Sequence, residues 1–264
     1  MTEIIAYGFA VLIGVSLGLI GGGGSILTLP VLVYLLGINP VLSTAYSLFV
    51  VGSTALVGSV NYMKKGLVSY KTAIIFAIPS LTAVFLTRKY LIPLVPAELF
   101  TIGGFLVTKN IAIMIFFALV MLIASYSMIR DKREETNENQ EPVYNIPLII
   151  VEGILVGVLT GIVGAGGGFL IIPALVLLAK LPMKMAVGTS LLIIAAKSLI
   201  GFLGDVANQP IEWLFLLQFT GLSIVGIFIG TYLSKFIPGA KLKKGFGWFV
   251  LLMGVYIIGK EFLG

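Results

Sequence analysis

The chain has 264 residues, of which 59% are apolar and only 11% are charged, and its formal net charge is +6. Soluble domains contain about 45–50% apolar and about 25% charged residues, so this composition excludes a soluble globular protein. The sequence has no cysteine and no histidine, which excludes a disulfide framework and the commonest metal ligand and general base. The basic residues lie at segment ends rather than along one face. We therefore expect no nucleic-acid partner, no metal and no cofactor.

Ten apolar segments follow one another along the chain, and several reach the roughly 20 residues needed to span a bilayer core. Their apolar runs are continuous rather than alternating, which favours helices over the strands of a membrane barrel. The sequence therefore predicts an all-α polytopic membrane protein. The segments cover residues 4–20, 25–37, 41–62, 70–88 and 110–129 in the first half, and residues 146–163, 168–180, 184–204, 211–234 and 245–262 in the second.

A single long polar stretch, residues 130–141, divides the ten segments into two equal sets. Its composition is typical of a solvated loop. We predict a first membrane repeat at residues 1–129, a cytoplasmic linker at 130–145 and a second membrane repeat at 146–264. Residues 91–109 are rich in proline and glycine, and the sequence leaves open whether they form an interfacial excursion or a short extra helix.

The distribution of basic residues predicts how the segments cross the membrane. Lysine and arginine concentrate in the cytoplasmic loops of membrane proteins. One path places 12 of the 17 basic residues in four such loops. In this path each half is a helical hairpin that enters and leaves on one side, followed by three crossings. It puts both chain termini outside and gives the two halves opposite orientations in the membrane.

The two halves are also related in sequence, at an offset of 143 residues. Residues 18–30 align with residues 161–173, and across residues 18–58 the alignment gives 13 identical positions out of 41. The matched glycines and prolines are not explained by hydrophobicity alone. Inverted repeats with paired interrupted segments are typical of secondary transporters whose binding site lies near the membrane midplane.

Two glycine clusters interrupt the apolar segments at equivalent positions of the two halves. A glycine costs about 1 kcal/mol relative to alanine inside a helix, so a cluster favours a break over a continuous helix. The helix after each break directs its free N–H groups and its dipole toward the break, which favours an anion there. The two breaks together would form a two-sided anion site. Its predicted members are Gly21, Gly22, Gly23, Gly24 and Ser25 in the first half, and Gly164, Gly166, Gly167 and Gly168 in the second.

The alternative is that the clustered glycines act only as a hinge or permit tight helix packing. Small residues spaced four apart let membrane helices approach closely. We expect that packing role for five other glycines, Gly14, Gly18, Gly153, Gly157 and Gly161. The clusters lack the G-K-[ST] ending of a phosphate-binding loop, so nucleotide binding is not expected.

Two charged residues lie within apolar segments. Lys197 falls in an otherwise apolar run, and a lysine at the centre of a membrane helix costs about 2.5–3.5 kcal/mol. It could be a counter-charge for an anionic substrate, or it could pair with Glu152 or extend toward the membrane surface. Glu152 is a candidate to carry a coupling proton, and the alternative is a solvated or ion-paired carboxylate near the cytoplasmic side.

Hydroxyl residues occur at matched positions after the two hairpins. Ser47 of the first half aligns with Ser190 of the second half, which follows Thr189. These hydroxyls are candidates for substrate contacts, and the alternative is hydrogen bonding to the backbone of their own helix. The sequence predicts neither a catalytic cluster nor a metal site.

The second half carries the pattern Gly161-x-x-Gly164-x-Gly166-Gly167-Gly168, followed by Pro173 and by the sequence AVGTSL at residues 186–191. In these residues the chain resembles the TauE/SafE sulfite exporter family, and the first half is similar through residues 18–30. The resemblance implies a bacterial or archaeal inner-membrane permease for small sulfur-containing anions, such as sulfite or organosulfonates like sulfoacetate. The first half departs from the pattern by reading AYS at residues 45–47 where the second reads GTS, and Lys197 is atypical of the family.

The leading hypothesis is a secondary transporter that exports such an anion across the inner membrane, driven by the proton gradient or the membrane potential. The alternatives are a permease for another small organic or inorganic anion, and a non-transporting membrane assembly subunit. An enzyme is not expected because the residues of the standard catalytic sites are missing. A cation permease is not expected because acidic rings are missing. The expected partners are the anion and the lipid bilayer.

Overall fold

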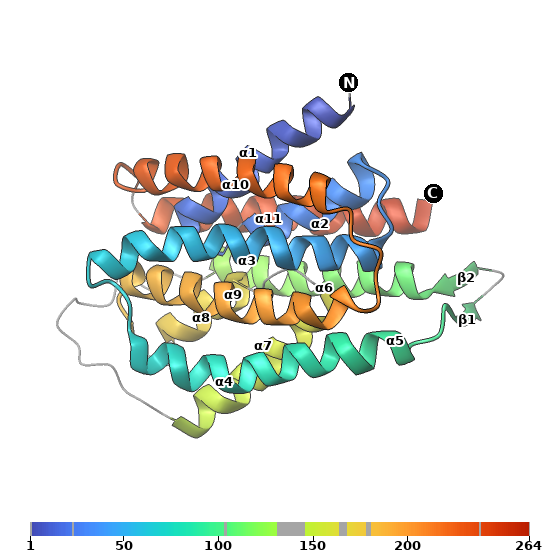
Figure 1. The fold of residues 1–264 in the computed structure, drawn as a ribbon, viewed down its shortest axis with the longest axis horizontal. Coiled ribbons are helices and arrows are strands. Elements are labelled where there is room, and N and C mark those ends of the chain that lie inside the picture. Colours follow the sequence, from blue (N-terminus) through green and yellow to red (C-terminus); the bar gives the residue numbers. More distant parts are fainter. Residues whose placement is uncertain are drawn as a thin grey trace.

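The structure, a computed structural model, describes residues 2–22, 24–102, 105–130, 146–163, 168–177, 181–237 and 239–263. Most of these residues form helices, and the long helices lie side by side in one bundle (Figure 1). Five of the described helices are long and apolar enough to cross a membrane. These findings confirm the prediction of a helical polytopic membrane protein. The predicted linker at residues 130–145 lies almost wholly outside the described residues.

The first half begins with a helix, a break and a short helix. The next long helix has a side-chain N-cap: Asn39 accepts a hydrogen bond from the Val41 N–H at 2.9 Å, and Pro40 occupies the first turn. The elements are α1 (Thr2–Ile20), α2 (Gly24–Pro30), the π-helical turn η1 (Val31–Leu35), α3 (Pro40–Lys64), α4 (Tyr70–Leu86), the π-helical turn η2 (Thr87–Leu91), α5 (Ile92–Leu94), the strands β1 (Glu98–Ile102) and β2 (Phe105–Thr108), and α6 (Lys109–Arg130).

The second half repeats the order of long and short helices but has no counterpart of the strands among its described residues. Its first helix ends directly before the second glycine cluster, and its second helix begins at the last glycine of that cluster. The elements are α7 (Ile146–Val163), α8 (Gly168–Leu177), α9 (Met183–Val206), α10 (Trp213–Leu233) and α11 (Gly239–Leu263).

Residues 91–109 contain a short helix, as one of the two expectations had it, and also an antiparallel hairpin. Strands β1 and β2 pair from Glu98–Thr108 to Ile102–Phe105, with an irregularity after Glu98. The Lys109 ammonium group donates hydrogen bonds to the carbonyls of Ile92 and Val95 and so ties the hairpin to the end of α5. The hairpin lies at the right-hand end of the bundle, opposite the loop that joins α3 to α4 (Figure 1).

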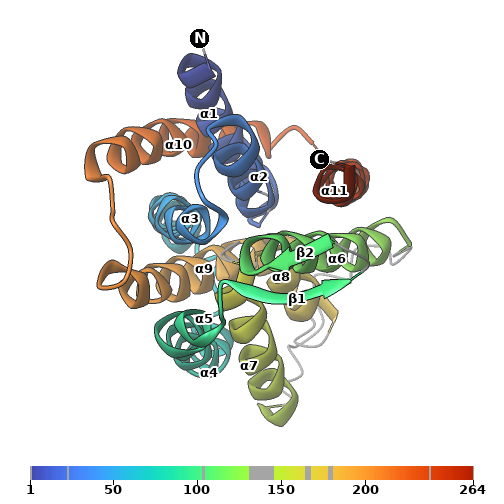
Figure 2. The same ribbon diagram turned by 90° about the vertical axis from the view of Figure 1, so that its right-hand side faces the viewer.

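The long helices pack in pairs that cross between the two halves. Helix α1 lies against α10, α4 against α7, α3 against α9, and α6 against α11. Figure 2 shows α3 and α9 in the middle, with the α1–α10 pair on one side and the α4–α7 pair on the other. Each half therefore completes its packing only on helices of the other half.

Glycines make the closest of these contacts possible. A β-carbon at Gly14 or Gly18 would lie less than 3.0 Å from backbone atoms of α10, and one at Gly153 or Gly157 would lie as close to backbone atoms of α4. A β-carbon at Gly161 would likewise lie less than 3.0 Å from the Thr87 side chain. The packing role predicted for these five glycines is confirmed, since any side chain there would force the helices apart.

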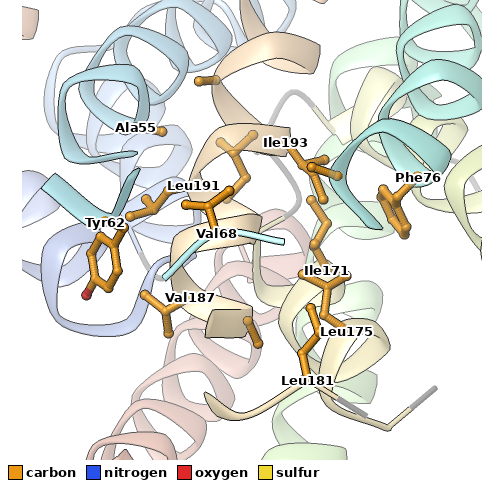
Figure 3. Close-up of a cluster of buried hydrophobic side chains, with 14 of the residues drawn as sticks. Ala55, Tyr62, Val68, Phe76, Ile171, Leu175, Leu181, Val187, Leu191 and Ile193 are labelled. Carbon is orange, nitrogen blue, oxygen red and sulfur yellow. The ribbon is translucent and has the colours of Figure 1, made fainter. Parts of the chain in front are cut away.

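The largest apolar cluster joins α3, α4, α8 and α9. Figure 3 shows Ile171 and Leu175 of α8 close to Leu181, while Val187, Leu191 and Ile193 point from α9 into the same cluster. Several of these side chains have no exposed surface at all. The short helix α8 is thus fixed against α9, which places the first residue of α8, Gly168, next to the middle of the bundle.

Candidate functional site

The first break has a defined backbone geometry. Helix α1 ends at Ile20, and Gly21 takes a φ of +75°, which only glycine adopts without strain. The Gly21 N–H donates to the Leu17 carbonyl at 2.7 Å. This is the pattern of an α-helix that ends in a single residue with the left-handed conformation. Helix α2 begins three residues later, at Gly24. The predicted break is therefore present, and it turns the chain back along α1.

The helix that follows the second glycine cluster begins directly against the first break. A β-carbon at Gly168, the first residue of α8, would lie less than 3.0 Å from Gly22 Cα and 3.2 Å from the Gly21 carbonyl oxygen. Helices α2 and α8 are also neighbours in the bundle. The start of α8 thus contacts the backbone of the first break, as expected if the two breaks form one site.

Helix α9 contributes one face to the same place. Ser190, Ile194 and Lys197 are spaced by four and three residues, so they lie on one side of the helix. The Ser190 hydroxyl donates to the Val187 carbonyl at 2.8 Å and lies 3.3 Å from the Gly21 carbonyl oxygen. The Ile194 side chain lies against Gly168. Lys197 follows one turn further along this face.

Lys197 is completely buried and has only a neutral partner among the described residues. Its ammonium group donates to the Thr160 hydroxyl oxygen at 3.0 Å, and the Thr160 hydroxyl donates to the Val156 carbonyl. The structure contains no ion pair between Lys197 and Glu152, which is half-buried on α7. An exposed fraction of 0% also excludes a lysine that extends to the surface. Both structural alternatives for Lys197 are therefore wrong in the described part of the chain.

The other predicted site residues are placed differently. Ser47 is buried on α3, and its hydroxyl meets no hydrogen-bond partner among the described residues. Thr189 accepts a hydrogen bond from the Ser69 N–H at 2.9 Å, so it holds the loop between α3 and α4 rather than the breaks. Gly24 packs against Ile13 and Leu17 of its own hairpin. The remaining residues, Gly23, Gly164, Gly166, Gly167 and the Ser25 side chain, lie outside the described part of the structure.

A second buried cation was not predicted as part of the site. The Arg88 side chain has no exposed surface, and both its Nε and its Nη2 lie 2.6 Å from Asp205 Oδ2. Its Nη1 donates to the Thr44 hydroxyl at 2.8 Å and to the Gly161 carbonyl at 3.2 Å. The guanidinium group of Arg88 therefore joins four elements, which are its own turn η2 and the helices α3, α7 and α9. Arg88 is the last residue of the predicted apolar segment 70–88, and the path predicted from the basic residues places it on the outer side of the membrane.

The two cations approach the same turn of α7. Thr160 contacts Lys197, and the next residue, Gly161, contacts Arg88. On α9, Lys197 and Asp205 are eight residues apart, which corresponds to about 12 Å along the helix axis. The breaks, Lys197 and Arg88 thus follow one another along α9 toward the end of the bundle that carries the hairpin.

Comparisons with known proteins identify the family of the chain. A profile of the sulfite exporter TauE/SafE family matches residues 6–257. A "Probable membrane transporter protein" of Xylella fastidiosa strain 9a5c is 30% identical over 263 residues, which cover 98% of this chain and 95% of the relative. The "Probable membrane transporter protein YunE" of Bacillus subtilis is 29% identical over 232 residues, covering 82% of this chain and 83% of the relative.

A shorter match reaches an archaeal protein. The "Probable membrane transporter protein MJ0441" of Methanocaldococcus jannaschii is 35% identical over 118 residues, which cover 42% of this chain and 44% of the relative. No solved structure matches the chain. Because the family profile covers nearly the whole chain, including both glycine clusters, the chain belongs to the sulfite exporter TauE/SafE family of membrane transporters.

Proposed function

We propose that this protein is a secondary transporter that exports small sulfur-containing anions, such as sulfite or an organosulfonate like sulfoacetate. The anion is held between the two glycine breaks, near the midplane of the cell's inner membrane. The observation that carries the proposal is the contact of Gly168 with Gly21 and Gly22. A helix that begins at such a point presents unpaired N–H groups and the positive end of its dipole to an anion.

The crossing pairs of helices support an inverted-repeat architecture for this transporter. Exchanging the two halves turns the α1–α10 pair into the α7–α4 pair, and it turns the α3–α9 and α6–α11 pairs into themselves. An approximate twofold axis between the halves produces this pattern. We therefore assign residues 1–129 and 146–264 to two repeats. In this assignment both termini are outside and residues 130–145 are cytoplasmic, which follows the distribution of lysine and arginine.

The charge of Lys197 supports an anionic substrate. A buried ammonium group without a carboxylate is costly in a membrane protein. A bound anion supplies the missing charge, and Ser190 and Ser47 offer hydroxyl groups from α9 and α3. Glu152 is our candidate for proton coupling because it is a half-buried carboxylate on α7, the helix that also carries Thr160.

Transport by the purified protein in liposomes tests the proposal. Wild-type protein is expected to move radiolabelled sulfite down its gradient, and Gly168→Ala is expected to lower the rate by about tenfold or more. The added methyl group would force α8 away from Gly22, an overpacking that costs about 1–3 kcal/mol. Gly221→Ala is the matched control, because a β-carbon at Gly221 meets no atom within 4 Å. Equal sulfite transport by both variants would refute the site between the breaks.

The same purified protein can be used to test the two alternative functions, a permease for another anion and a non-transporting subunit. A thermal-shift screen with sulfite, organosulfonates and carboxylates identifies a permease for another anion, since a ligand that binds the folded state raises the melting temperature. A non-transporting assembly subunit would show no flux of any of these anions. The absence of an acidic cluster among the described residues gives no support to a metal cation as the substrate.

A further inference from the structure

The Arg88–Asp205 pair has hydrogen-bonding capacity that the fold does not use. Both Nε and Nη2 converge on the single oxygen Oδ2 of Asp205, whereas a fork-like pair would use both carboxylate oxygens. Although Nη2 lies 2.6 Å from that oxygen, it finds no acceptor in hydrogen-bonding geometry among the described residues. A completely buried guanidinium group is thus left with an unused donor.

A guanidinium group can bind other oxyanions as well as a carboxylate. Its parallel N–H groups bind two oxygens of one planar or tetrahedral anion, and sulfonate and sulfite groups offer three oxygens. One oxygen of a sulfite or sulfonate could accept from Nε and another from Nη2. Asp205 instead places the single oxygen Oδ2 near both nitrogens. A sulfur oxyanion in place of the Asp205 carboxylate could therefore use the Nη2 donor that the carboxylate leaves without a hydrogen bond.

The position of the pair connects it with the proposed site. Asp205 lies on α9 eight residues beyond Lys197, and the residues after it, 206–208, are exposed. Gly161, which accepts from Arg88, directly follows Thr160, which accepts from Lys197. The pair thus lies between the proposed site and the C-terminal end of α9.

We propose that Arg88 forms a second binding site for the transported anion, in which a sulfite or sulfonate group displaces the carboxylate of Asp205. This inference rests on the proposed transport of sulfur-containing anions. Asp205 acts as a resident competitor: it neutralises Arg88 when no anion is there, and it expels the anion afterwards. A transport path requires sites that bind strongly enough for entry and weakly enough for release.

The second site belongs to one end of the transporter alone. The alignment of the halves places Thr231 opposite Arg88 and Tyr62 opposite Asp205. Neither counterpart carries a charge that could repeat the pair. The anion therefore meets a competing carboxylate on only one side of the breaks, so its release on that side differs from its release on the other.

Two variants test the second site in liposomes and by sulfite titration of the purified protein. In Asp205→Asn the amide oxygen still accepts from Arg88, but the competing charge is gone. Sulfite is expected to bind about tenfold more tightly, equivalent to about 1.4 kcal/mol, and to be transported more slowly. In Arg88→Gln combined with Asp205→Asn, both charges of the pair are removed, so neither is left buried without the other. This double variant is expected to bind sulfite at Lys197 as before, but to transport it about tenfold more slowly.

Lys89→Gln is the matched control, because it removes a positive charge from the next residue, which is exposed and lies over the rings of Phe85 and Tyr90. It is expected to bind and transport sulfite like the wild type. The second site is refuted if Asp205→Asn binds sulfite no more tightly and the double variant transports it at the wild-type rate. The proposed function survives that result. If the wild-type protein itself moves neither sulfite nor a sulfonate, both proposals fall together.

Discussion

Two buried cations of this protein, Arg88 and Lys197, have opposite surroundings. Both side chains have no exposed surface, and both contact a threonine hydroxyl, Thr44 in one case and Thr160 in the other. Arg88 also has a carboxylate at 2.6 Å and a backbone carbonyl at 3.2 Å. Lys197 has neither among the described residues. One cation is thus neutralised by the fold, and the other is left for a charge that comes from outside.

The difference separates a charge that the fold neutralises when no anion is bound from a charge that it leaves without a carboxylate among the described residues. Removing one member of a buried ion pair costs about 3–5 kcal/mol, because the other charge stays buried without a partner. An ammonium group that has no carboxylate contributes no such pair, so its retention in an apolar helix needs another reason. Binding of an anion is the reason we propose, and the following substitutions compare the two cations.

The largest loss of stability is expected for Arg88→Ala. It leaves the Asp205 carboxylate buried alone and should lower the free energy of unfolding by about 3–5 kcal/mol. Equilibrium unfolding in mixed detergent micelles measures the change. In the double variant Arg88→Ala, Asp205→Ala neither charge of the pair is left without the other, so most of the loss should be recovered. A single variant as stable as the wild type would show that the pair does not hold the four elements together.

A matched pair of threonine substitutions should give a smaller and unequal loss. Thr160→Val removes the hydrogen-bond acceptor of Lys197 and should cost about 1.5–3 kcal/mol, the range for a hydrogen bond to a charged group. Thr44→Val leaves Arg88 with its carboxylate and its carbonyl, so it should cost about 1 kcal/mol. The same unfolding measurement applies to both. Equal losses would contradict the contrast between a neutralised and a lone cation.

The smallest effect on stability, but a large effect on transport, is expected for Lys197→Met. Methionine has a similar length and removes the buried charge, and the free energy of unfolding should change by about 1 kcal/mol or less. Sulfite transport should fall about tenfold or more, which liposome uptake measures. Lys64→Met, at the exposed end of α3, serves as the control and should transport sulfite normally. Normal transport by Lys197→Met would exclude the lysine from the site.

The sequence predicted the features that depend on local physics. The helical membrane class follows from the composition, and the break at residues 21–24 follows from the conformational cost of clustered glycine. The hairpin at residues 98–108 also has a local signal in the sequence. Two apolar runs, LFTI and FLVT, flank the dipeptide Gly103-Gly104, which is typical of a two-residue hairpin turn. The short helix and the hairpin together explain the proline and glycine content of residues 91–109.

The Arg88–Asp205 pair could not be predicted in the same way. The two residues are 117 positions apart, and each lies near the end of an apolar segment. Charged residues in such places usually mark the membrane surface, so nothing in the local pattern distinguishes a buried pair. Lys197 could be recognised because it interrupts the middle of an apolar run. Its partner Thr160 could not, because that contact depends on how α7 packs in the bundle.

The crossing of helix pairs between the halves has a consequence for how the protein is made. Helix α1 packs its glycines on α10, which begins about 190 residues later in the chain. At roughly 5–20 residues per second of synthesis, α1 waits roughly 10–40 seconds for this partner. During that time lipid or the insertion machinery must cover a face shaped for another helix. Helix α1 thus enters the membrane long before the helix on which it packs, and a truncation before α10 would leave the glycine face of α1 without its partner.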